Sequence, residues 1–146
     1  MKISPAGVDA IRQREGFRTT AYQDTRGIWT IGVGHTGPEV HQGLVWTTAQ
    51  VDAALAADLA RFEACVNRAV HVPVTQNQFD AMVSLAYNIG ESGFASSSVA
   101  RVLNRAVTDA AEAFMLWSNP PELKARRESE RRQFLSLGEP SNASSS

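Results

Sequence analysis

The sequence lacks most of the features that would direct a chain to a membrane, to nucleic acid or into a disulfide framework. Its single cysteine, Cys65, excludes a disulfide within the chain. No apolar run approaches the roughly 20 residues of a membrane span, and the N-terminus lacks the roughly 7–15 apolar residues of a signal peptide. With 14 basic and 15 acidic residues, the net charge of −1 gives no general attraction to nucleic acid. We therefore expect no export signal, no membrane span and no nucleic-acid partner.

Metal and cofactor motifs are also missing. The histidines, His35, His41 and His71, do not follow the spacing of metal ligands. No nucleotide-binding or organic-cofactor pattern occurs, so we expect chemistry performed by side chains alone.

What the sequence does contain indicates one folded domain, residues 1–138. A length of 146 residues fits the roughly 100–200 of a single domain, and 43% hydrophobic residues can fill a core. The last eight residues, "EPSNASSS", are typical of a frayed terminus. We predict a flexible tail over 139–146.

The N-terminal third predicts a helix followed by a β-hairpin. Ser4 before Pro5 is typical of a helix start, and Gly16 of a helix end. Two β-like runs follow, Thr19–Gln23 and Ile28–His35, separated by the turn sequence "DTRG".

The rest of the chain has helical signals. Thr47 with Gln50 has the pattern of a capping box opening a helix to about Val70, and Thr75 with Gln78 repeats it before "FDAMVSLAYNIG". Shorter helices are expected at about Ser97–Asn104, Asp109–Trp117 and Glu122–Leu137. The fold class is therefore α+β, with a small hairpin lobe (about 16–46), a larger helical lobe (about 50–138 plus the N-terminal helix) and a long helix joining them.

Glu15 is the first residue whose position indicates chemistry. It continues the stripe of Val8 and Ile11, and it lies in the last turn, where the helix dipole disfavours a carboxylate. Both effects favour the protonated acid that a general acid requires. The alternative is an acid in a fraying turn that points to water.

The hairpin supplies the second and third candidates. Asp24 begins the turn, where an aspartate can simply bond the turn backbone. In a continuous second strand, Gly32 and Gly34 would leave one face bare beside Thr30, as at a ligand surface; the alternative is a glycine-rich bend. Two carboxyl groups in different environments are what glycoside hydrolysis uses.

The segment "REGFRTTAYQDTRGIWTIGVGHTG" closely resembles the signature of the phage-type lysozymes, the endolysins of glycoside hydrolase family 24. Their pattern of Glu, eight residues, Asp or Cys, five residues and Thr is met by Glu15, Asp24 and Thr30. "TGPEVHQG", "DLARFEACVNRAVHVPVTQNQFDAMVSLAYNIG" and "RRESERRQFL" are also similar to that family, so the resemblance covers nearly the whole chain before the tail. It implies a lysozyme-like fold.

The resemblance implies a muramidase that cleaves the β-1,4 bond between N-acetylmuramic acid and N-acetylglucosamine in peptidoglycan. Glu15 would be the general acid, and Asp24 and Thr30 would position an attacking water, which suits inversion. Direct attack by Asp24, with retention, remains the alternative. The rival functions are a lytic transglycosylase and a wall-binding module without catalysis.

Four further residues complete the predicted site. Asp58 lies on the core stripe of its helix, where a buried acid needs a partner, and the resemblance suggests His35 as a structural partner. Tyr22 is a candidate cleft residue or an inward-packing tyrosine. Asn88 is a candidate for binding an N-acetyl group, although asparagine near a helix end is common for local reasons.

The basic residues of the last helix are mostly assigned to a solvated face, and one of them, Arg126 or Arg127, is expected to approach Glu15 or an acidic wall group. We expect a monomer. An endolysin without an export signal would accumulate in the host cytoplasm and depend on a separate holin to reach the wall in the periplasm.

Overall fold

The computed structural model describes residues 1–103 and 107–136. The predicted tail 139–146 and the predicted helix ends Asn104 and Leu137 lie outside these residues. The chain divides into two compact units. Asp9–Arg61 forms the sheet unit, and Met1–Val8 together with the described residues from Phe62 onward forms the helical unit.

Helix α1 (Pro5–Glu15) begins and ends where the sequence predicted. The Ser4 hydroxyl accepts a hydrogen bond from the Gly7 N–H at 3.0 Å, which satisfies one of the unpaired donors of the first turn. Gly16 follows the helix with a φ of +75°, a conformation that glycine adopts at little cost. The division between the units falls within α1, so its residues from Asp9 onward belong to the sheet unit rather than to the helical lobe that the sequence predicted.

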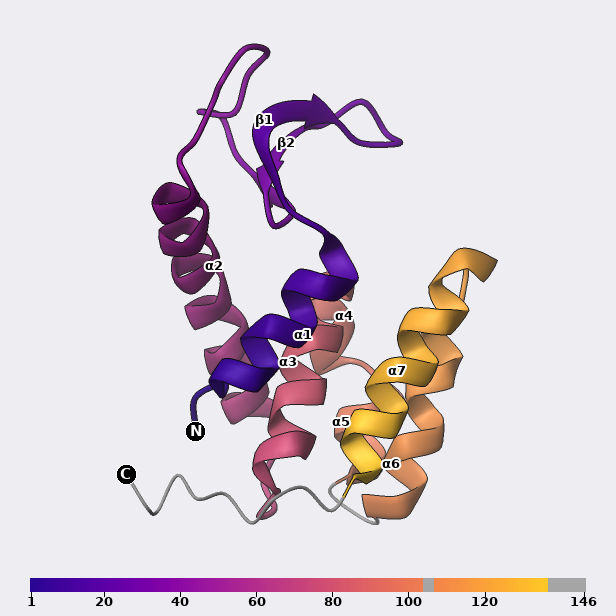
Figure 1. Cartoon of the computed structure of the whole chain (residues 1–146). Coiled ribbons are helices and arrows are strands. Elements are labelled where there is room, and N and C mark those ends of the chain that lie inside the picture. The colour runs from indigo at the N-terminus through magenta and orange to yellow at the C-terminus, as the bar shows by residue number, and fades with distance from the viewer. Residues whose placement is uncertain (104–106, 137–146) are drawn as a thin grey trace. The chain divides into compact units, whose positions relative to one another are not determined.

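The strands of the sheet unit are β1 (Arg18–Gln23), β2 (Trp29–Gly32) and β3 (His35–Thr36), which form an antiparallel sheet in the order β1-β2-β3. Figure 1 labels β1 and β2. Tyr22 on β1 is opposite Thr30 on β2, and Thr30 is opposite Thr36 on β3. Residues paired across neighbouring strands have their side chains on the same face, so these three share one side of the sheet.

The prediction of one continuous strand over Ile28–His35 is wrong. The chain turns between β2 and β3, with Gly32 at a φ of +67° and Gly34 at +73°. The predicted bare face is also wrong, because an added Cβ on Gly32 would lie 3.4 Å from the Trp46 ring and 3.5 Å from Val51. Both glycines serve a bend, which was the alternative interpretation of this stretch, and Gly32 packs against Trp46 and Val51.

Helix α2 (Thr48–Ala69) confirms the first predicted capping box. The Thr47 hydroxyl accepts from the Gln50 N–H at 3.1 Å, and the Gln50 side chain accepts from the Thr47 N–H at 2.8 Å. The helix runs through the division between the units at Arg61 and Phe62.

The helical unit is built around α3 (Gln76–Ile89), which packs against α7 (Lys124–Leu135). The second predicted capping box and the terminal Gly90 are both present at the ends of α3. The remaining described elements are α4 (Glu91–Ala95), α5 (Ser98–Leu103), α6 (Val107–Ala113) and the 3-10 turns η1 (Phe114–Trp117) and η2 (Pro121–Leu123). Every residue from Phe79 to Ala86 is buried, so α3 forms the centre of this unit.

None of the helices in the described ranges combines the length and apolar character that a bilayer-crossing segment needs.

Candidate active site

Glu15 is the last residue of α1 and is half-buried. Ile11, one turn earlier, is fully buried. Glu15 therefore lies at the margin of the sheet unit's core. Its burial is intermediate between the two alternatives that the sequence left open, a buried acid and an acid that points to water.

Asp24 organises the turn between β1 and β2. Its Oδ1 accepts hydrogen bonds from the backbone N–H groups of Arg26 at 2.8 Å and Ile28 at 2.9 Å. The hydrogen bond from Ile28 has the largest effect on the pKa of Asp24, and it lowers that pKa. Together with the hydrogen bond and charge of Arg26 it outweighs the opposing effect of burial, so the pKa of Asp24 lies below its ordinary 3.8. Asp24 is therefore ionised at neutral pH, and within the described part of the chain no donor reaches Oδ2.

Thr30 lies on β2 and is 4% exposed. Its hydroxyl donates to the carbonyl of Ile28 at 2.9 Å, and the same carbonyl accepts from the Asp24 N–H at 2.9 Å. Because the hydroxyl's one proton is used in this bond, Thr30 can only accept from a further partner. The backbone of Ile28 thus links Asp24 and Thr30, and both present acceptor oxygens.

Tyr22 is half-buried on β1, directly opposite Thr30. The guanidinium of Arg18 lies over its ring, 4.4 Å from the ring centroid. A cation held against one face of the ring limits the side chain's rotation. Tyr22 therefore shares the sheet face of Thr30 in a defined orientation.

Asn88 belongs to the helical unit, in the last turn of α3, and is half-buried. Its Oδ1 accepts a hydrogen bond from Nη2 of Arg127. Arginine has no acceptor, so the amide must turn its oxygen toward Arg127 and its NH₂ group away. Asn88 can therefore offer donors to a ligand.

Arg127 is itself fully buried, so it does not belong to the solvated face to which most basic residues of this helix were assigned. It pairs with the fully buried Glu130 and donates from Nε to the Trp117 carbonyl at 2.9 Å. Glu130 also accepts from the Ser84 hydroxyl at 2.5 Å and from Arg126 at 3.3 Å. The spacing of Arg127 and Glu130, three residues apart on one helix, was the available signal, but it does not distinguish a buried pair from an exposed one.

The contact predicted between His35 and Asp58 is present, with Nδ1 2.7 Å from Asp58 Oδ2. A second contact, not predicted from the sequence, places Glu39 Oε1 2.6 Å from His35 Nε2. The Trp46 ring lies 5.3 Å from the imidazole, centroid to centroid. A histidine four residues before a glutamate is the only sequence signal for this second contact.

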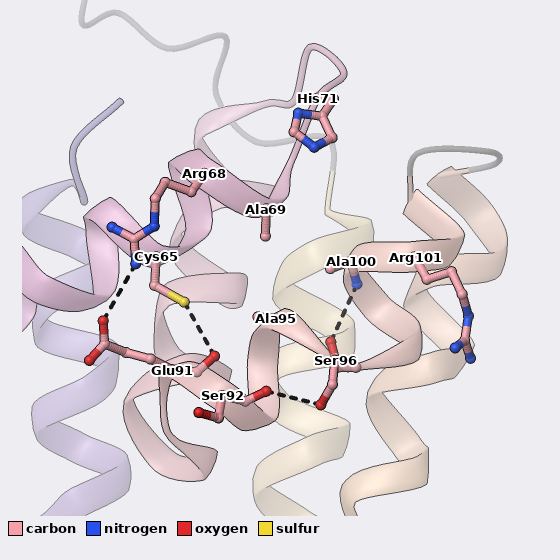
Figure 2. Close-up of a pocket in the computed structure, with 11 residues that line it drawn as sticks. Cys65, Arg68, Ala69, His71, Glu91, Ser92, Ala95, Ser96, Ala100 and Arg101 are labelled. Carbon is pink, nitrogen blue, oxygen red and sulfur yellow. Dashed lines mark hydrogen bonds and ion pairs between the residues drawn. The ribbon is translucent and has the colours of Figure 1, made fainter.

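A cavity of about 720 Å³ lies in the helical unit, beside the end of α2, α4 and α5 (Figure 2). None of the predicted site residues lines it. Its polar groups bond one another: Cys65 Sγ contacts the Glu91 carbonyl at 3.6 Å, and Arg68 pairs with Glu91 at 3.6 Å. Burial raises the pKa of the Cys65 thiol, so this thiol is protonated rather than a nucleophilic thiolate.

The comparisons with known proteins agree with this fold. Residues 12–130 match the family described as phage lysozyme. An endolysin of Salmonella phage P22 is 44% identical over 145 residues, which cover 93% of this chain and 99% of the relative.

Solved structures give the same result. The endolysin from Escherichia coli O157:H7 phage FAHEc1 has a TM-score of 0.90 at 37% identity, covering 96% of this chain and 97% of that one. The muramidase domain of SpmX from Asticaccaulis excentricus has a TM-score of 0.85 at 43% identity, covering 92% and 98%. The predicted α+β, lysozyme-like fold is confirmed.

The chain belongs to the phage lysozyme family. It is a glycoside hydrolase of the muramidase class, an enzyme that lyses peptidoglycan.

Proposed function

We propose that the protein hydrolyses the β-1,4 bond between N-acetylmuramic acid and N-acetylglucosamine in peptidoglycan, and so acts as an endolysin in bacterial lysis. Glu15 donates a proton to the leaving glycosidic oxygen. Asp24 and Thr30 hold the water that attacks the anomeric carbon, and Asp24 accepts the proton that this water loses.

The observation that supports these roles best is the link through Ile28. Asp24 offers Oδ2 and Thr30 offers its hydroxyl oxygen, and both groups are fixed by the same backbone segment. A water that donates one proton to each of them keeps a lone pair for attack. This arrangement favours inversion; in the retaining alternative, the ionised Asp24 attacks the sugar directly.

Two other functions are open to the same test. A lytic transglycosylase would use Glu15 and release an anhydro sugar without adding water. A wall-binding module would bind without cleavage. The paired acceptors Asp24 and Thr30 favour hydrolysis over both, because neither rival needs a positioned water.

Tyr22 and Asn88 are proposed to contact the saccharide. The donor group that Arg127 leaves on Asn88 suits an acceptor such as the carbonyl of an N-acetyl group. Titrating catalytically inactive protein with a cell-wall saccharide should shift the NMR signal of the Asn88 side-chain amide. A saturated complex in which this signal is unmoved would remove Asn88 from the site.

The deciding experiment is turbidity clearing of permeabilised Gram-negative cells by the wild type, by Glu15→Gln and by Glu128→Gln. Loss of a general acid should reduce the rate by about 100-fold or more. Glu128 is exposed on α7, so its variant has the same charge change and should clear at the wild-type rate. Equal clearing by wild type and Glu15→Gln would show that Glu15 is not the acid. Mass analysis of products made in H₂¹⁸O separates hydrolysis from transglycosylation.

The lysis role includes three further proposals: a monomeric enzyme, accumulation in the host cytoplasm, and release by a separate holin. Expression in host cells should lyse them only when a membrane-permeabilising protein is supplied as well. Lysis by the protein alone would contradict the holin requirement, and sedimentation at twice the chain mass would contradict the monomer.

A further inference from the structure

His35 is held between two carboxylates. Its Nδ1 lies 2.7 Å from Asp58 Oδ2, and its Nε2 lies 2.6 Å from Glu39 Oε1. A neutral imidazole has one N–H and one lone pair, so it can donate to only one of them. The lone pair would then face the other carboxylate oxygen at hydrogen-bond distance and be repelled. Only the imidazolium satisfies both contacts.

The three residues come from three segments of the sheet unit. His35 is on β3, Asp58 is on α2 and Glu39 is in the loop after β3. The side chains of His35 and Asp58 are 18% and 20% exposed, whereas that of Glu39 is 55% exposed. Glu39 therefore closes the cluster on the solvent side.

The loop is shaped for this contact at Gly37. A Cβ added there would lie 2.5 Å from Glu39 Oε2, which is closer than real Cβ atoms approach an oxygen. The glutamate side chain folds back across the space that a side chain at residue 37 would fill. A residue larger than glycine here would therefore make the flexible carboxylate end of Glu39 move from its present position.

The cluster adjoins a proposed catalytic residue through the sheet. His35 pairs with Ile31, and the next residue, Thr36, pairs with Thr30. β3 is two residues long, so its own ladder with β2 is short. Contacts that fix His35 therefore contribute substantially to holding β3 against the segment that contains Thr30.

We propose that Glu39 is a positioning residue for the reaction: with Asp58 it holds His35 as an imidazolium, and this cluster, Glu39–His35–Asp58, fixes β3 beside β2 and thereby the place of Thr30. The proposal rests on the proposed function in its last step, the role of Thr30.

The acid–base balance of the cluster agrees with this geometry. Burial lowers the pKa of His35, but the hydrogen bonds and charges of Glu39 and Asp58 outweigh it, so the pKa lies above the ordinary 6.5. The bond to His35 lowers the pKa of Glu39 below 4.5. The cluster is at full strength between pH 4.5 and pH 6.5. It weakens as the pH rises through the raised pKa of His35 or falls through the lowered pKa of Glu39.

The test is an NMR titration of the histidines in the wild type and in Glu39→Gln, together with the pH profile of kcat for wall hydrolysis. In Glu39→Gln, we expect the pKa of His35 to fall, the amide signals of Thr30 and Thr36 to move, and the alkaline limb of kcat to shift to lower pH. Glu128→Gln is the matched control and should leave all three unchanged. An unaltered pKa of His35, or an altered one with unmoved Thr30 signals and pH profile, would overturn the proposal.

A second variant separates the position of Glu39 from its charge. Gly37→Ala keeps the carboxylate but occupies its space, and the Gly37 backbone has no positive φ that would strain an alanine. If the alanine displaces the carboxylate from His35, the three readouts should change in the same direction as in Glu39→Gln. A lowered pKa of His35 with unmoved Thr30 signals and an unmoved pH profile would contradict the proposal. The NMR readouts do not require catalysis, so a failure of Glu15 as the acid would leave this test interpretable.

Discussion

The two units of the chain each hold an ionic cluster, and the clusters differ in their cation. The helical unit has Arg127 against Glu130, both with fully buried side chains. The sheet unit has His35 between Asp58 and the more exposed Glu39. Arginine stays protonated at every pH that a protein survives, whereas histidine is the side chain whose charge is most readily lost near physiological pH.

The two clusters therefore differ in how they respond to pH: the arginine cluster stays charged, whereas the histidine cluster keeps its charge only over a limited pH range. The helical cluster holds Asn88 through a guanidinium that cannot be neutralised. The histidine cluster, which includes a residue of the strand paired with Thr30, depends on pH. We therefore expect the helical unit to be insensitive to mild alkali and the surroundings of the proposed water site to respond to it.

The largest effect is expected from breaking the helical cluster with Glu130→Ala. This change leaves the guanidinium of Arg127 buried without its carboxylate, and a buried charge without its partner typically costs about 3–5 kcal/mol in the free energy of unfolding. Urea denaturation followed by circular dichroism measures the loss.

The matched control is the double variant Arg127→Met with Glu130→Leu, which removes both charges and keeps apolar volume. Replacing a buried pair in this way is often neutral or stabilising, so most of the stability should return. A double variant as unstable as Glu130→Ala would mean that the cost came from lost shape or from Ser84 and Arg126, which also bond Glu130, rather than from an unpaired charge.

An intermediate effect is expected from Asp58→Asn in the sheet unit. A hydrogen bond to a charged group contributes about 1.5–3 kcal/mol, and asparagine keeps the shape without the charge. Because the pKa of His35 is raised, the contribution is complete below pH 6.5 and is lost as the pH rises through the raised value. The deficit of Asp58→Asn relative to wild type should therefore shrink with rising pH in parallel urea titrations. A deficit that is constant with pH would show that packing, not charge, joins these residues.

The sequence predicted the parts of this comparison that depend on local signals. The capping boxes at Thr47 and Thr75 join residues that are three apart in the sequence, so one short segment contains both partners of each hydrogen bond. The contact of Asp58 with His35 followed from a core stripe and a family resemblance. Such features can be predicted because few alternatives satisfy the same local pattern.

The features that the sequence did not predict depend on residues far away along the chain or on the sign of a backbone φ angle. Gly32 was assigned to a bare strand because sequence shows that glycine is present but not whether its φ is positive. The sequence did not show which basic residue of the last helix is fully buried, because the burial of Arg127 involves Asn88 and Trp117, 39 and 10 residues away. Glu39 was missed because a surface loop gave no reason to expect that it turns back to His35.

The smallest effect is expected from Asp52→Asn, which removes the nearer of two carboxylate partners of Arg12 in the sheet unit; Asp9 lies at 3.9 Å. Arg12 Nη2 lies 2.5 Å from Asp52 Oδ1, a distance as short as those within the two clusters. The side chains are, however, 37% and 51% exposed, so water solvates both charges whether or not they meet. Exposed pairs typically contribute about 0–1 kcal/mol, and screening by salt reduces that further.

We expect Asp52→Asn to lower the free energy of unfolding by less than about 1 kcal/mol, with any difference disappearing in high salt. A loss equal to that of Asp58→Asn would mean that separation alone sets the strength of these pairs. The expected order, Glu130, then Asp58, then Asp52, follows burial instead. On that basis, the half-exposed Glu39 should influence the protonation of His35 more than it influences the stability of the sheet unit.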